Sequence, residues 1–165
     1  MTAHRDRRSV LHYAYRLLSY RDRSEAEMVR RLTMKGFDEP AVAGAILQLK
    51  ESGFINDRKL AASLRRYAEE SKHLSASGTR RFLLKRGLPA EMISDALGDT
   101  DEIGTARRLV EKKISAWGKH AATGRSLHVD AALFRKLYGI LYRRGYPSDA
   151  IKEVLEPYRD KEDTE

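Results

Sequence analysis

Apolar residues recur at intervals of three and four along most of the chain, with polar residues between them. In residues 9–20, for example, this spacing places Val10, Ala14 and Leu17 on one side of a helix. No segment alternates β-branched and polar residues as a half-buried strand does. The pattern therefore predicts an all-α protein, and it divides into nine helices.

A six-residue pattern occurs three times and consists of a leucine, three residues, a glycine and a large apolar residue. The copies run from Leu32 to Phe37, from Leu83 to Leu88 and from Leu141 to Tyr146. A glycine in the left-handed conformation often ends a helix, and the residue after it folds back onto the residue four before the glycine. Each copy therefore predicts a helix end, and Gly53 predicts a fourth.

The similarity between the copies continues beyond the glycine into the next helix. Apolar residues stand six positions after it, at Val42, Ile93 and Ile151, and ten positions after it, at Ile46, Leu97 and Leu155. These offsets fall on one face of a helix. We therefore predict three tandem three-helix repeats in an elongated, curved array. Their predicted boundaries are 9–55, 56–98 and 99–157, and an acidic tail, 158–165, is predicted to be disordered.

Several local signals mark where the predicted helices begin. Ser24 and Glu27 have the spacing of a capping box, in which each side chain bonds the backbone N–H of the other residue. Asn56 is predicted to cap the first helix of the second repeat. Residues 71–78 are predicted to form a linker, and residues 118–126 a loop.

The charge of the chain favours a polyanionic partner. Lys and Arg number 32 against 24 Asp and Glu, which gives a formal net charge of +8. Nucleic acid is the partner that such a balance suggests most directly. The chain has no cysteine and no apolar run long enough to span a bilayer, and its first nine residues are polar. We therefore expect a cytoplasmic monomer that does not bind membranes.

The chain lacks the residue patterns of common catalytic and metal sites. No glycine-rich phosphate loop follows a predicted strand, and no two histidines have metal-ligand spacing. The serines fall at predicted caps and loops, without a histidine and aspartate relay. We therefore predict that the protein is not an enzyme and needs no metal or cofactor.

Paired basic residues, several next to aromatic ones, are the candidates for binding a filament or DNA. Arginine pairs with phosphate through two hydrogen bonds, and aromatic rings stack on bases. An alternative interpretation is that some of them, such as Lys35 and Arg144, only stabilise helix C-termini. The predicted contact residues are Arg30, Arg31, Arg65, Arg66, Arg80, Arg81, Lys85, Arg86, Arg107, Arg108, Lys112, Lys113, Arg135, Lys136, Arg143 and Arg144.

The order and spacing of these motifs resemble the RecX family of bacterial regulatory proteins. The segments that carry the resemblance are Arg23–Glu27, Lys35–Phe37, Gly53–Ala61, Arg86–Leu88 and Leu141–Tyr146. The chain departs from the family pattern in the middle repeat, where Ser75 replaces a frequent glycine and Gly78 stands nearby. Phe82–Leu83 also replaces a Glu-Leu pair.

The resemblance implies a non-catalytic regulator that binds the RecA–single-stranded DNA filament in its groove. It would inhibit filament extension, ATP hydrolysis, strand exchange and co-protease action, and so regulate DNA repair and the SOS response. Binding to duplex DNA would be weaker. Two alternatives stay open: a direct DNA-binding protein with helix-turn-helix-like modules, and a helical-repeat adaptor whose basic charge only maintains solubility.

Overall fold

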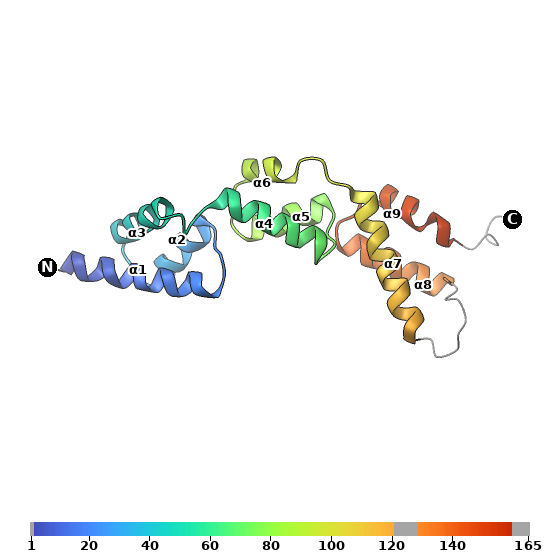
Figure 1. The fold of residues 1–165 in the computed structure, drawn as a ribbon, viewed down its shortest axis with the longest axis horizontal. Coiled ribbons are helices and arrows are strands. Elements are labelled where there is room, and N and C mark those ends of the chain that lie inside the picture. Colours follow the sequence, from blue (N-terminus) through green and yellow to red (C-terminus); the bar gives the residue numbers. More distant parts are fainter. Residues whose placement is uncertain (1, 121–128, 160–165) are drawn as a thin grey trace. The chain divides into compact units, whose positions relative to one another are not determined.

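The computed structural model describes residues 2–120 and 129–159, and the side chains within 9–117 and 129–159. These residues form nine α-helices and one 3-10 turn, with no strand among them (Figure 1), so the all-α prediction is confirmed. The helices are α1 (Thr2–Tyr20), α2 (Glu25–Met34), α3 (Glu39–Glu51), α4 (Asp57–Glu70), α5 (Ala76–Lys85), α6 (Ala90–Leu97), α7 (Glu102–His120), α8 (Ala131–Arg143) and α9 (Ser148–Leu155). No helix in this part of the chain is both long and apolar enough to cross a membrane.

Contacts group the described residues into two compact units. Unit 1 takes in Met1–Arg65 and Arg81–Ala96, and unit 2 takes in Arg66–Arg80 and the chain from Leu97 onward. Helices α4 and α5 therefore contribute residues to both units. The three-repeat boundaries stay a prediction.

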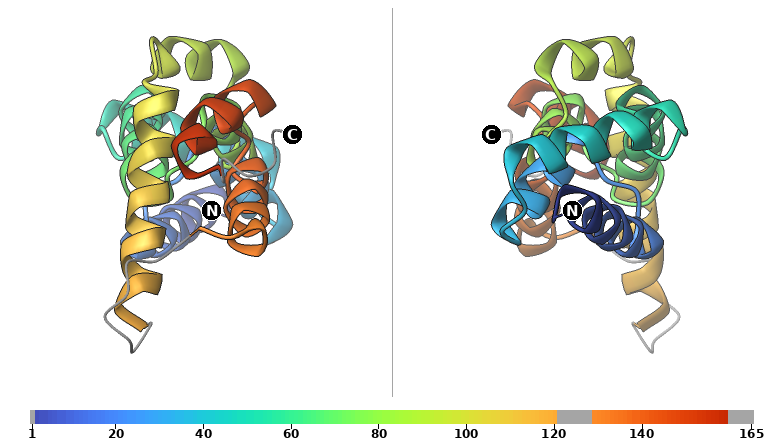
Figure 2. Two further views of the ribbon diagram at one scale, coloured as in Figure 1. Left: turned by 90° about the vertical axis from the view of Figure 1, so that its right-hand side faces the viewer. Right: turned by 90° about the vertical axis from the view of Figure 1, so that its left-hand side faces the viewer.

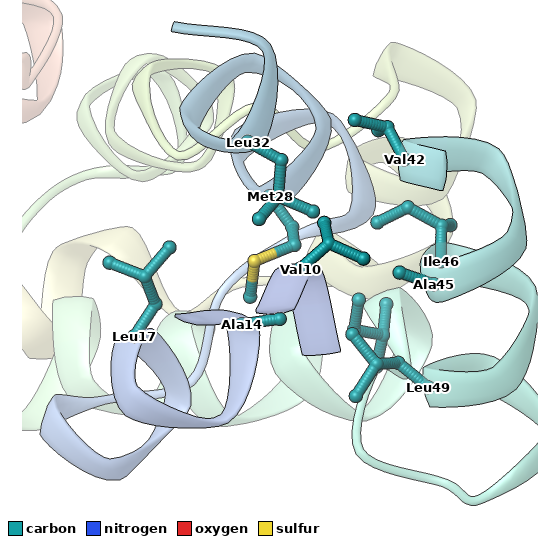
Figure 3. Close-up of a cluster of buried hydrophobic side chains, with 10 residues drawn as sticks. Val10, Ala14, Leu17, Met28, Leu32, Val42, Ala45, Ile46 and Leu49 are labelled. Atoms are coloured by element: carbon teal, nitrogen blue, oxygen red, sulfur yellow. The ribbon is translucent and has the colours of Figure 1, made fainter. Parts of the chain in front are cut away.

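The core of unit 1 lies between α1, α2 and α3 (Figure 3). Helix α1 contributes Val10, Ala14 and Leu17, α2 contributes Met28 and Leu32, and α3 contributes Val42, Ala45, Ile46 and Leu49. All of them were expected from the helical spacing. Val29 of α2, by contrast, is 38% exposed. It falls at the edge of the apolar stripe of α2, where Glu27 is buried instead.

The core of unit 2 lies between α7, α8 and α9, which pack together at one end of the chain (Figure 2, left). Its most buried side chains include Leu109 and Val110 from α7, Leu137 and Leu141 from α8, and Ile151 and Leu155 from α9. The repeat offsets are confirmed here and elsewhere, because Val42, Ile93 and Ile151, and likewise Ile46, Leu97 and Leu155, are all buried.

The predicted helix ends have the expected backbone geometry. Gly36, Gly87 and Gly145 adopt φ values of +95°, +78° and +91°, which only glycine takes without strain. The amide of the residue after each glycine donates to the carbonyl oxygen of the repeat leucine, at 3.3 Å in all three copies. Gly53 repeats the arrangement, with Phe54 N–H donating to Leu49 O at 2.8 Å. This is the Schellman type of helix end.

Some predicted boundaries were wrong. Helix α1 begins at Thr2 rather than at residue 9, α5 already begins at Ala76 within the predicted linker, and α7 continues to His120 through the start of the predicted loop. Residues 121–126 of that predicted loop lie outside the described residues, as does the tail beyond residue 159. Hydrophobic spacing locates a helix well but gives little information about its last turn.

Candidate nucleic-acid interface

Unit 1 contains a junction between the start of α2 and the end of α5. The Ser24 hydroxyl donates to the carbonyl oxygen of Arg86 at 2.6 Å, while it also accepts the backbone N–H of Glu27 as the α2 cap. Arg86 in turn donates through Nη2 to the carbonyl oxygen of Asp22 at 2.9 Å. A Cβ on Gly87 would lie only 2.9 Å from the Ser24 oxygen, so this close approach requires glycine.

Unit 2 contains the corresponding junction between the start of α5 and the end of α8. The backbone N–H of Ser75 donates to the carbonyl oxygen of Arg144, and Arg144 Nε donates to the carbonyl oxygen of Lys72 at 2.9 Å. The Tyr146 hydroxyl donates to His73 O at 3.1 Å. A Cβ on Gly78 would overlap the Arg144 carbonyl oxygen. This explains why a glycine stands at this position of the middle repeat.

The two junctions are copies of one arrangement, and each lies within one unit. Ser24 and Ser75 are 51 residues apart, the same spacing as Gly36 and Gly87. In both junctions the arginine just before a repeat glycine donates a hydrogen bond to a backbone carbonyl oxygen in an earlier loop. Arg86 donates to the loop before α2, and Arg144 donates to the loop before α5. Ser24 was predicted only as a helix cap and Ser75 only as a departure from the family pattern, although the 51-residue offset could have identified their shared place in the junctions. The predicted contact residues Arg86 and Arg144 thus hold the fold together.

A buried carboxylate surrounded by arginines lies beside the first junction. Glu27 is only 4% exposed and accepts hydrogen bonds from Arg21 at 3.0 Å, from Arg31 at 3.1 Å and from Arg23. Arg86 Nε approaches it at 3.8 Å. The capping box was therefore only half right, because Ser24 caps α2 as predicted but the Glu27 carboxylate binds arginines instead. The contact residue Arg31, predicted for a filament or DNA, is engaged here.

A group of basic side chains lies near the loop that joins α4 to α5 in unit 2. Its members come from α7 and from the end of α8, far apart in the sequence. Arg108 is anchored by Thr105, whose hydroxyl accepts its Nη2 at 2.9 Å. Burial, followed by the positive charges of Lys112, Arg144, Arg108 and Lys113, lowers the pKa of His73 below its usual value. We call Arg108, Lys112, Lys113 and Arg144 the unit 2 basic cluster.

Helix α8 carries further basic side chains. Lys136 Nζ lies 4.4 Å from the centre of the Trp117 ring, a cation–π contact within the unit. Arg143 runs back along the helix, and its Nη1 would be 3.2 Å from a Cβ on Gly139. Arg135 donates to the carbonyl oxygen of Ala131 in its own helix, at 3.2 Å, and is exposed.

The other predicted contact residues are distributed over several helices. Arg65 is partly buried and donates to Ala96 O at 2.9 Å. The exposed members of this set lie on α2, α4, α5 and α7, and they are Arg30, Arg66, Arg80, Arg81, Lys85 and Arg107. No cluster of three or more His, Cys, Asp or Glu residues within the described ranges has the geometry of a metal site. The exposed side chains of this set are cations, which attract anions.

Known proteins resemble this chain in sequence and in structure. A family model described as "RecX, first three-helix domain" matches residues 11–49. The regulatory protein RecX of Trichlorobacter lovleyi is 32% identical over 147 residues, covering 87% of this chain and 91% of that protein. RecX of Mycobacterium sp. strain KMS is 34% identical over 150 residues, covering 87% and 78%. The crystal structure of RecX from Lactobacillus salivarius shares the fold, with a TM-score of 0.70 at 22% identity, covering 93% of this chain and 96% of that one.

Proposed function

Because the chain belongs to the RecX family of regulatory proteins, we propose that it binds the filament of RecA on single-stranded DNA. Bound in the groove of that filament, it inhibits filament extension, ATP hydrolysis, strand exchange and co-protease action. In this role it is a non-catalytic cytoplasmic regulator of DNA repair and the SOS response, and it acts as a monomer.

The observation that supports this proposal most is the unit 2 basic cluster. Four cations lie near one loop, where burial and then their positive charges lower the pKa of the neighbouring His73. A filament built on DNA exposes phosphates along its length. Neutralising phosphates releases bound counterions, so such a surface binds a polyanion with an affinity that falls as salt rises. The cluster therefore suits the DNA component of the filament.

The repeated modules also suit a target that repeats. The Schellman ends, the buried apolar positions and the two junctions recur along this chain. A helical filament presents the same surface again at each subunit. When several weak contacts are linked in one chain, the second and later contacts form at a high effective concentration, so the whole binds more tightly than any part.

The test is RecA's DNA-dependent ATPase rate in the presence of this protein and two charge-reversal variants. Lys112→Glu reverses a charge in the unit 2 basic cluster, and Lys152→Glu reverses an exposed charge on α9 of the same unit. We expect the wild type to lower the rate, Lys112→Glu to inhibit less and to show a salt slope smaller by about one, and Lys152→Glu to match the wild type. An unchanged rate with excess wild-type protein would sink the proposal.

Two other outcomes would replace this proposal by another. Tight, sequence-selective binding of duplex DNA without RecA would indicate a direct DNA-binding protein whose three-helix modules act like helix-turn-helix units. Partner binding that does not change with salt would indicate an adaptor, because a surface that contacts phosphates must weaken as salt rises.

A further inference from the structure

Helix α8 presents an exposed tyrosine on a helix that carries only positive charge. Its sequence contains three basic residues, Arg135, Lys136 and Arg143, and no acidic one. Tyr142, the second-to-last residue of the helix, is 64% exposed. A large aromatic side chain this open to water gains little from the core, and most of its ring surface is accessible to a partner.

The ring of Tyr142 is held in a defined orientation. It lies nearly parallel to the ring of Tyr138, at an angle of 15° and with 6.5 Å between the ring centres. Tyr138 itself packs against the unit 2 core, and its hydroxyl lies 3.4 Å from the Ser148 hydroxyl. Tyr142 is thus positioned by a partly buried neighbour while most of its own surface stays open.

Comparison of the repeats shows that the fold does not need an aromatic residue here. The position three before the repeat glycine holds Thr33, Leu84 and Tyr142 in the three copies, and all three side chains are exposed. The position just before it is buried in every copy, where it is always leucine. The module therefore requires leucine at the buried position and leaves the exposed one unconstrained.

We propose that Tyr142 is a stacking platform for an unpaired base of single-stranded nucleic acid, with the adjacent Arg143 contacting a flanking phosphate. Aromatic rings beside cations are what sequence-independent single-strand binders use, because every base has a π face and every linkage a charge. Bases of a duplex are already stacked and do not offer that face. The inference deepens the proposed function by specifying how the protein contacts DNA.

The test compares a thymidine oligonucleotide of about 20 nucleotides with an abasic backbone of the same length, by fluorescence anisotropy at low salt. Stacking is typically lost on replacement by alanine, so Tyr142→Ala should weaken binding of the thymidine strand about 5- to 100-fold. It should leave the affinity for the abasic strand unchanged. Tyr142→Phe keeps the ring and should bind as the wild type does.

Tyr20→Ala is the matched control, because Tyr20 is 78% exposed and lies in unit 1. It should bind both strands as the wild type does. The proposal is overturned if Tyr142→Ala keeps its affinity for the thymidine strand, even when it binds RecA filaments less well, since Tyr142 then contacts protein. It is also overturned if the variant loses affinity for both strands equally.

The outcome is separable from that of the proposed function. A wild type that prefers the thymidine strand but leaves RecA's ATPase rate unchanged would sink the regulatory proposal and leave the stacking site standing. A wild type that inhibits RecA but binds the two strands equally would support the regulatory proposal and overturn the stacking site.

Discussion

Replacing Glu27 by glutamine tests the buried ionic cluster of unit 1. The substitution preserves the shape of the side chain and removes its negative charge. It leaves the guanidinium groups of Arg21, Arg23 and Arg31 around a neutral amide. Arg23 loses most, because only 7% of its side chain is exposed and little water can solvate its charge in place of the carboxylate.

The expected cost follows from the burial of each pair. Breaking a buried pair by neutralising one partner typically costs about 3–5 kcal/mol, and the pair with Arg23 is of this kind. The pairs with Arg21 and Arg31 have arginines 40% and 44% exposed, so solvent screening limits each to about 0–1 kcal/mol. Glutamine keeps one acceptor for these donors. We therefore expect a loss of about 2–4 kcal/mol, a large part of the stability of a small domain.

The effect should depend on pH in a definite direction. Burial alone would raise the pKa of Glu27, but hydrogen bonds from Arg21 and Arg31, with the charges of Arg21 and Arg23, outweigh it and the pKa is lowered. A carboxyl with a lowered folded-state pKa stabilises the fold above its unfolded-state pKa, and that stabilisation disappears as pH falls through the folded-state value. The difference between wild type and Glu27→Gln should therefore shrink below about pH 4.

The assay is urea denaturation followed by circular dichroism at neutral and acidic pH. Glu51→Gln, an exposed change at the end of α3 in the same unit, is the control and should stay within about 0.5 kcal/mol of the wild type. Equal stability of Glu27→Gln and wild type at neutral pH would refute the reasoning. A difference of constant size down to acid pH would refute the electrostatic part.

Two further changes test the junction in unit 2. Gly78→Ala places a Cβ on the Arg144 carbonyl oxygen and should lower the stability by about 1–3 kcal/mol. The loss should appear as a lower Tm, measured by the fluorescence of the single tryptophan, Trp117. An unchanged Tm would contradict the close approach. His73 has φ +48°, a backbone conformation that asparagine tolerates, and its pKa is lowered. The wild type should therefore lose stability relative to His73→Asn as pH falls below about 6.5. Parallel profiles of stability against pH for the two proteins would show that His73 is not responsible.

The helices and their ends were predictable because they depend on residues close in sequence. A leucine four residues before a glycine predicts both the helix end and the buried position, as at Leu83 and Gly87. Helix starts were harder to place: Thr2 stands in a polar stretch without apolar spacing, and Ser75, which caps α5 by accepting the backbone N–H of Gly78, stands in a stretch of small polar residues typical of a linker. Such ends depend on packing that a local pattern does not record.

The roles of the basic residues were much less predictable. Arg86 and Arg144 look alike in the sequence, as basic residues before a repeat glycine, and both hold junctions between segments more than 60 residues apart. Glu27 looks like a capping residue, yet its carboxylate binds arginines that lie before and after it. Which charge stays available for a partner depends on these long-range contacts. Local periodicity contains no information about them.

Binding to single-stranded DNA, with and without a RecA filament formed on it, tests the central claim most directly. The measurement uses the wild-type protein at about 50 and 200 mM salt. The account predicts that the filament binds far better than bare DNA at both concentrations, because protein and DNA both contribute to the surface recognised. Equal binding to filament and bare DNA, abolished in both cases by salt, would contradict it and describe a general DNA-binding protein.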